Sequence, residues 1–225
     1  IYQISRNLFN EKTAGIAALL FSILPFQVHF AQEIRMYNLL SFWLLLATFS
    51  FLRGRNGNWK WWILFAVASA LAQYTHNLAA VYLIPLAITP LIQKDWKTFK
   101  SVGIASIVSI LLYLPWLIQL PAQFAKVQSS YWVERPGIEK IFTLILFYLP
   151  HLPLPSNLLL PGLLIASLTI ALAGFQTLIA KRKQPEPANK TLWLAYLAFM
   201  PPILLWSVSQ FVPVYIERAL LPSHA

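Results

Sequence analysis

Four side chains capable of chemistry lie within six residues of one another: Gln32, Glu33, Arg35 and Tyr37. A guanidinium group binds phosphate through two parallel hydrogen bonds. A carboxylate can act as a general base, stabilise charge or ligate a divalent cation. Long apolar segments flank this motif, and charges at such a junction are costly to bury. The motif is therefore our first candidate for a functional site.

Each of these residues also has a simpler interpretation. Glu33 and Arg35 could form an ion pair that ends a helix at a membrane interface. His29 lies one helical turn before Glu33 and could contact it. His76, in a turn between two apolar segments, is more often a structural residue that forms a hydrogen bond to a helix end than a ligand-binding one.

Three further polar sets follow along the chain, after apolar segments. They are Tyr74-Thr75-His76-Asn77, then Tyr131, Trp132, Glu134 and Arg135, and finally Tyr215, Glu217 and Arg218. If the four sets share one face of a membrane, they form a cavity of acids, cations and aromatic rings. Such a cavity suits a charged, amphipathic substrate.

The composition predicts the elements that hold these residues in place. Hydrophobic residues make up 58% of the chain and charged residues 11%, against about 25% charged in ordinary soluble domains. We therefore predict an all-α, polytopic transmembrane helix bundle that forms a single domain over residues 1–225. The absence of cysteine excludes disulfides and thiolate metal sites.

The net charge of +10 is concentrated in short basic clusters between the apolar runs, which indicates membrane topology rather than nucleic-acid binding. The clusters divide the chain into seven predicted spans: Thr13–Phe30, Tyr37–Leu52, Trp61–Tyr74, Leu78–Ile92, Ser101–Ile118, Leu158–Ala180 and Thr191–Phe211. The segments on the basic side carry a net charge of +9 and those on the other side +1. This asymmetry predicts that the basic side faces the cytoplasm.

Residues 119–157 form the longest segment that is not predicted to span. We expect a non-cytoplasmic loop there, with Ile141–Tyr148 as an interfacial or re-entrant helix on the outer face. Because the sequence starts at Ile1 rather than Met and stops after a polar cluster, we also expect it to be a piece of a longer protein.

The segment Leu24–Tyr37, which ends in Gln32-Glu33-Ile34-Arg35-Met36-Tyr37, resembles the P-x-x-x-x-x-x-Q-E-x-R-M-Y stretch of bacterial family 39 glycosyltransferases. These enzymes belong to the GT-C superfamily, and their relatives include the dolichyl-phosphate-mannose protein mannosyltransferases and the lipid A aminoarabinose transferases. Three weaker matches follow in the same order: Tyr74-Thr75-His76, then Tyr131-Trp132 with Arg135-Pro136, and Tyr215 to Pro222. Ala219 stands where the family usually has an aromatic residue.

The resemblance implies a multi-pass enzyme of the bacterial plasma membrane. It would transfer a sugar from a polyprenyl-phosphate donor to a lipid, glycan or protein acceptor on the non-cytoplasmic face. The family's catalytic acid is expected before Ile1, with Glu33 in support. The substrate-binding residues would be Gln32, Arg35, Tyr37, His76, Tyr131, Trp132 and Arg218.

The resemblance implies particular roles for these residues. Arg35 and Arg218 would bind the donor phosphate, while Glu33 would orient Arg35 or assist a cation or a sugar hydroxyl. Tyr131 and Trp132 would belong to an outer loop that covers the substrate. No metal site is predicted, and a divalent cation is left open as a cofactor.

Two other classes of protein fit the composition. A transporter or lipid flippase would also place charges and aromatic rings at a membrane cavity, but it should carry polar residues at mid-span. The predicted spans are almost wholly apolar inside, which favours chemistry at the membrane surface. A non-catalytic membrane scaffold is the third class.

Overall fold

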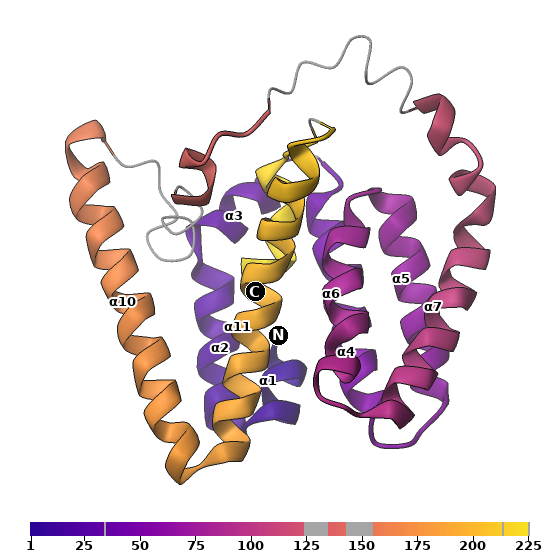
Figure 1. The fold of residues 1–225 in the computed structure, drawn as a ribbon, viewed down its shortest axis with the longest axis horizontal. Helices are drawn as coiled ribbons and strands as arrows, with labels where there is room; N and C mark the ends of the chain where they lie inside the picture. Colours follow the sequence, from indigo (N-terminus) through magenta and orange to yellow (C-terminus); the bar gives the residue numbers. More distant parts are fainter. Residues whose placement is uncertain (34, 124–134, 143–154, 213, 225) are drawn as a thin grey trace.

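The computed structural model describes residues 1–33, 35–123, 135–142, 155–212 and 214–224. Every regular element in these ranges is a helix, and no strand occurs in them, which confirms the predicted all-α class (Figure 1). The helices are α1 (Tyr2–Leu8), α2 (Glu11–Ile23), α3 (Pro25–Gln32), α4 (Tyr37–Gly54), α5 (Lys60–Thr75), α6 (Ala79–Ile92), α7 (Trp96–Leu117), α10 (Ser156–Lys183), α11 (Pro185–Ser209) and the 3₁₀ helix η1 (Glu217–His224).

Most predicted spans correspond to one helix each. Helix α4 begins at Tyr37, as predicted, and α5 and α6 lie within two residues of their predicted bounds. The predicted turn at Thr75-His76-Asn77 is confirmed, because α5 ends at Thr75 and His76 has an extended backbone. Two separate helices therefore occupy this region instead of one long broken helix.

The predicted span Thr13–Phe30 is wrong, because the helix breaks inside it. Leu24 has φ −62° and ψ 120°, which ends α2, and Pro25 opens α3. A proline disfavours the α conformation of the residue before it, and its fixed φ suits the first position of a new helix. The apolar run is continuous in sequence, but this one backbone angle divides it into helices of 13 and 8 residues.

The count of seven spans is also not supported. Among the described residues, three helices are long and apolar enough to cross a membrane: α7, α10 and α11. Helices α5 and α6 have 16 and 14 residues, against roughly 20 for a full crossing. Helix α4 has 18 residues, but Asn38 and Arg53 lie near its ends.

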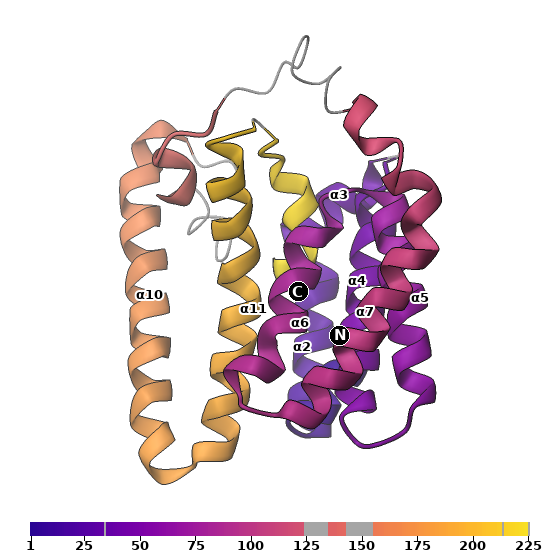
Figure 2. The ribbon, with the colours of Figure 1, turned by 45° about the vertical axis from the view of Figure 1, so that its right-hand side comes forward.

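The core is built around α4, whose Leu40, Leu44 and Phe51 are fully buried. Helix α5 packs against it with a run of buried alanines that includes Ala68 and Ala72. Small residues let helix backbones approach closely, which is how helices associate where the surrounding solvent is itself apolar. Helix α10 lies mainly along α11 and exposes most of its side chains (Figure 2).

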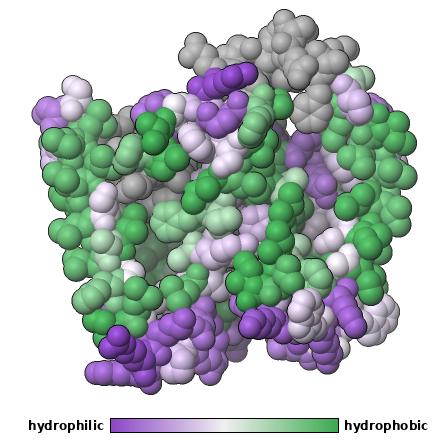
Figure 3. All heavy atoms as spheres, viewed as in Figure 1, coloured by the Kyte–Doolittle hydropathy of each residue, from purple (hydrophilic) through white to green (hydrophobic). Residues whose placement is uncertain are grey.

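The two ends of the bundle differ in character. The α4–α5, α6–α7 and α10–α11 connections lie at one end, while α3 and the α5–α6 turn lie at the other. Hydrophilic residues gather along the first end, and hydrophobic residues cover much of the middle of the face in Figure 3. Arg55 Nη2 and Asp95 Oδ2 lie 3.5 Å apart and join the α4–α5 and α6–α7 connections. The basic clusters at these connections therefore share one end of the structure, which we call the basic end.

Candidate functional site

The α3–α4 junction places Glu33 and Arg35 beside each other, with both side chains partly exposed. Arg35 Nε lies 3.8 Å from Glu33 Oε2, and His29 Nε2 lies 3.9 Å from Glu33 Oε1. The predicted Glu33–Arg35 pair and the predicted His29 contact are both present, although each distance is too long for a hydrogen bond. An exposed pair of this kind stabilises a fold by at most about 1 kcal/mol. The Arg35 side chain is 54% exposed and is accessible to a ligand.

Residues at the start of α4 hold this junction in place. Asn38 Nδ2 donates a hydrogen bond to the carbonyl oxygen of Phe30 at 3.1 Å, which fastens α4 to α3. Tyr37 is 5% exposed and belongs to the main hydrophobic core. The ring of Tyr37 lies against the ring of His76, with centroids 5.8 Å apart. Two of the predicted site residues are therefore in contact.

His76 has the structural role that its position in a turn predicts. Its ring Nδ1 accepts a hydrogen bond from the backbone N–H of Leu78 at 3.1 Å. The backbone N–H of His76 donates to the carbonyl oxygen of Ala72. Burial lowers the pKa of His76 below its usual value. Because Nδ1 is an acceptor, the ring proton of the neutral form lies on Nε2, which can donate to a ligand.

The segment with Arg218 reaches the same region from the far end of the chain. Helix η1 contacts α3, α4, α6 and α11, and its Ala219 joins the same core cluster as Tyr37. The side chains of Glu217 and Arg218 lie outside what the structure describes. The backbone of Arg218 is thus near α3 and α4, while its predicted phosphate contact stays a prediction.

Tyr131 and Trp132 lie outside the described residues, as does most of the predicted interfacial helix. The neighbouring residues 135–137 are described, and α11 holds them. Trp206 Nε1 donates to the carbonyl oxygen of Gly137 at 3.1 Å, and Gln210 Nε2 donates to that of Pro136 at 3.0 Å. This anchor is not among the sequence-based predictions. The indole of Trp206 and the amide of Gln210, near the end of an apolar segment, are hydrogen-bond donors that could have indicated it.

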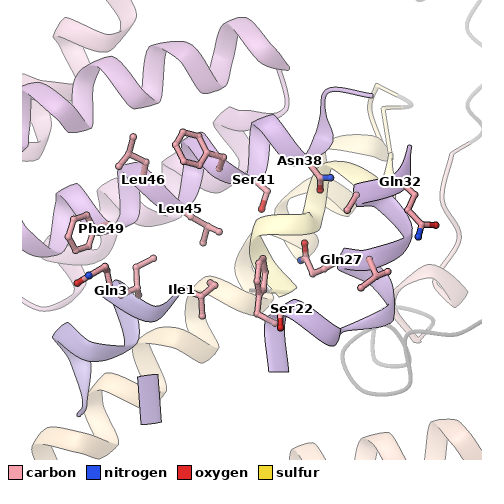
Figure 4. Close-up of a pocket in the computed structure, with 15 residues that line it drawn as sticks. Ile1, Gln3, Ser22, Gln27, Gln32, Asn38, Ser41, Leu45, Leu46 and Phe49 are labelled. Carbon is pink, nitrogen blue, oxygen red and sulfur yellow. The ribbon is translucent and has the colours of Figure 1, made fainter. Parts of the chain in front are cut away.

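An open cavity of about 870 Å³ adjoins the junction, and no local pattern in the chain predicts it. Helices α1 to α4 line it, and Gln32 is among the lining residues (Figure 4). Gln27, Gln32 and Asn38 gather at one end, while Leu45 and Phe49 lie toward the other. The cavity thus combines a polar end beside the charged motif with a mainly apolar body.

Ser41 lies between the two ends of this cavity. The residue is 4% exposed, and its hydroxyl has no hydrogen-bond partner among the described residues. A buried hydroxyl without a partner carries a free-energy cost of about 1–3 kcal/mol. A ligand with a polar group at this depth could satisfy it.

The described residues give no direct indication of a metal centre. No group of three or more His, Asp or Glu side chains in these ranges could hold a metal ion together. The use of a divalent cation as a cofactor stays a hypothesis.

These observations define a helical membrane protein with a charged helix junction beside an apolar cavity. Its family follows from a comparison with known families, in which residues 1–119 match the dolichyl-phosphate-mannose-protein mannosyltransferases. The match covers more than half of the chain, so the protein belongs to this family, whose members are membrane glycosyltransferases of the GT-C type. Searches of curated proteins and of solved structures returned no match.

Proposed function

We propose that this protein takes part in the transfer of a sugar from a polyprenyl-phosphate donor to an acceptor at a membrane surface. The observation that carries the proposal is the cavity that Gln32 lines beside Glu33 and Arg35. A polyprenyl-phosphate sugar has a charged headgroup and a long apolar chain. The charged junction suits the headgroup, and the apolar body of the cavity suits the chain.

The donor phosphate is the group that Arg35 would bind. Arg35 is exposed at the junction, and guanidinium groups match phosphate geometry with two hydrogen bonds. We propose Arg218 as the second phosphate ligand, because η1 packs against α3 and α4. Two cations on the phosphate would stabilise the negative charge that develops as it leaves.

The reaction would be a direct displacement at the anomeric carbon of the sugar. An acceptor oxygen forms a bond to this carbon while the bond to the phosphate oxygen breaks. The polyprenyl phosphate leaves with the electron pair, and a carboxylate base takes the proton of the acceptor hydroxyl. Glu33 would orient Arg35 through their existing contact or assist a cation or a sugar hydroxyl.

The remaining residues would shape the donor pocket. Tyr37 and His76 form one packed wall, and Gln32 would donate a hydrogen bond to the sugar. We propose that Tyr131 and Trp132 cover the bound substrate. The charged motif and the basic end lie at opposite ends of the bundle, so a cytoplasmic basic end would place this site on the non-cytoplasmic face of the plasma membrane.

A transporter or flippase fits this arrangement less well. Such a protein should place its polar groups near the middle of its helices. Here the charged residues of the site lie at a helix junction.

Donor binding tests the role of the two arginines. Arg35→Ala and Arg218→Ala should each weaken binding of a polyprenyl-phosphate sugar by about tenfold or more, because a hydrogen bond to a charged group contributes about 1.5–3 kcal/mol. Arg6→Ala is the matched control, since Arg6 lies in α1 and pairs with Glu11. Wild-type affinity in both test variants would exclude the phosphate role.

A second pair of variants tests the cavity as the site of the apolar chain. Leu45→Trp fills space inside the cavity, whereas Leu39→Trp, on the same helix, changes an exposed residue that does not line it. Leu45→Trp should weaken binding of the long-chain donor, and Leu39→Trp should not. Equal affinities in the two variants would place the chain elsewhere.

A further inference from the structure

A second cavity of about 850 Å³ opens at the basic end of the bundle, away from the charged α3–α4 junction. Helices α1, α4, α6, α10 and α11, or the residues that directly follow α4 and α6, line this cavity. Its charged lining residues are three cations and one acid: Arg55, Lys181, Lys190 and Glu186. The lining therefore carries a net charge of +2, so it favours an anion.

Hydrogen bonds between α6 and α11 brace the inner wall of this cavity. Trp193 Nε1 donates to Thr89 Oγ1, and the Tyr196 hydroxyl donates to the carbonyl oxygen of Pro85, both at 3.1 Å. Phe51 stacks on Trp193 with the ring planes only 15° apart. This wall is packed and buried, so the cavity has a rigid, largely apolar base.

The cations are only partly neutralised. Lys190 Nζ forms a 2.7 Å ion pair with Glu186, and Arg55 has the longer 3.5 Å contact with Asp95. Lys181 has no ion-pair partner within the described part of the chain, and Arg182 and Lys183 follow it directly. Positive charge is thus available in the lining of the cavity, at Lys181.

We propose that this cavity binds the phosphate headgroup of an anionic phospholipid from the membrane leaflet at the basic end. Arg55 and Lys181 would hold the phosphate, as basic pockets between membrane helices do for acidic lipids. Ile92 and Leu52 provide apolar contacts for the upper part of the lipid. The site is separate from the proposed donor site, and it does not depend on sugar-transfer activity.

The bound lipid would also connect two parts of the fold. Helix α10 packs mainly along α11, while Lys181 of α10 and Arg55 of the α4–α5 connection line the same cavity. A phosphate between them links α10 to the main bundle. Anionic lipid should therefore raise the thermal stability of the protein.

The experiment compares two double variants of equal charge. Arg55→Gln with Lys181→Gln removes the two proposed phosphate ligands, whereas Arg182→Gln with Lys183→Gln removes two neighbouring cations that do not line the cavity. The purified protein is placed in nanodiscs of phosphatidylcholine with or without phosphatidylglycerol. The readouts are the unfolding temperature and the phosphatidylglycerol retained in native mass spectrometry.

We expect phosphatidylglycerol to raise the unfolding temperature of the wild type and of the control. The test variant should lose most of this rise and bind phosphatidylglycerol about tenfold or more weakly. Equal losses in both double variants would overturn the proposal, because they would indicate diffuse attraction of acidic lipid. Undiminished binding in the test variant would overturn it as well.

A single variant and a phosphate control separate loss of lipid binding from misfolding and from binding of a soluble anion. Lys181→Gln alone changes an exposed residue at the end of α10 and serves if the double variant does not fold. The single variant should still bind phosphatidylglycerol more weakly than Lys183→Gln. Inorganic phosphate added to the protein in detergent should leave its unfolding temperature unchanged. Stabilisation by phosphate equal to that by the lipid would identify a soluble anion as the ligand and overturn the lipid proposal.

Discussion

The ring of Tyr37 lies against the ring of His76, with centroids 5.8 Å apart and planes tilted by 35°. Tyr37 opens α4, directly after the charged motif, and His76 lies in the turn between α5 and α6. This contact connects the motif to a second polar set that is distant in sequence. A change in the charge of His76 should therefore alter the packing at the start of α4.

Acid should destabilise the protein through His76. Burial lowers the pKa of this side chain, so the unfolded chain binds a proton at a higher pH than the folded one does. The stabilisation that comes from neutral His76 is complete above about pH 6.5, the pKa of a histidine in the unfolded chain. It is lost as the pH falls through the lower pKa of His76 in the folded protein. We expect the unfolding temperature to fall from about pH 7.5 to about pH 5, and to fall less in His76→Gln. An unchanged slope in His76→Gln would contradict the prediction.

Two glycines should respond in opposite ways to alanine. A Cβ atom at Gly54 would lie 2.7 Å from the Trp62 ring. At Gly103, apart from its chain neighbours and the nearby backbone of α7, the described residues place no atom within 4 Å of a Cβ. Gly54→Ala should lower the free energy of unfolding by about 1–3 kcal/mol through overpacking. Gly103→Ala, in the middle of α7, should raise it by roughly 0.5–1 kcal/mol. Denaturant unfolding measures both, and a neutral Gly54→Ala would show that Trp62 moves freely.

Asp95 should stabilise the start of α7 mainly as a helix cap. Its Oδ1 accepts a hydrogen bond from the backbone N–H of Thr98 at 3.1 Å, and hydrogen bonds from the Thr98 side chain and backbone lower the pKa of Asp95. Asp95→Ala should cost about 1 kcal/mol. Asp95→Asn keeps the cap and loses only the charge facing Arg55, so it should cost less. Equal losses of unfolding temperature in the two variants would assign the stabilisation to the ion pair instead.

Trp206 should control the opening of the segment that begins at Arg135. Trp206→Phe removes the hydrogen bond to the Gly137 carbonyl but keeps an aromatic ring, and one such bond contributes about 1 kcal/mol. Hydrogen exchange of residues 135–142 should therefore become roughly fivefold faster. The control is Trp96→Phe, an exposed position at the basic end. Equal exchange in both variants would mean that α11 does not hold this segment.

The sequence by itself determined the helical class and most helix positions. Long apolar runs separated by basic clusters predict membrane helices, because an unpaired backbone is costly in an apolar solvent. The start of α4 at Tyr37 and the turn at His76, directly after α5, follow from polar residues that interrupt these runs. The break at Leu24 follows from Pro25, because the backbone limits that a proline imposes outweigh the continuity of the apolar run.

Tertiary structure alone decided how the pieces of the site meet. The Tyr37–His76 contact, the Trp206 anchor and the cavity beside Gln32 join residues from separate helices. Their formation depends on helix crossing angles and side-chain packing, which leave no local pattern in the chain. The phosphate role of Arg35 thus begins as a motif in the sequence, while the apolar cavity that would receive the rest of the donor exists only because α1 to α4 pack around it.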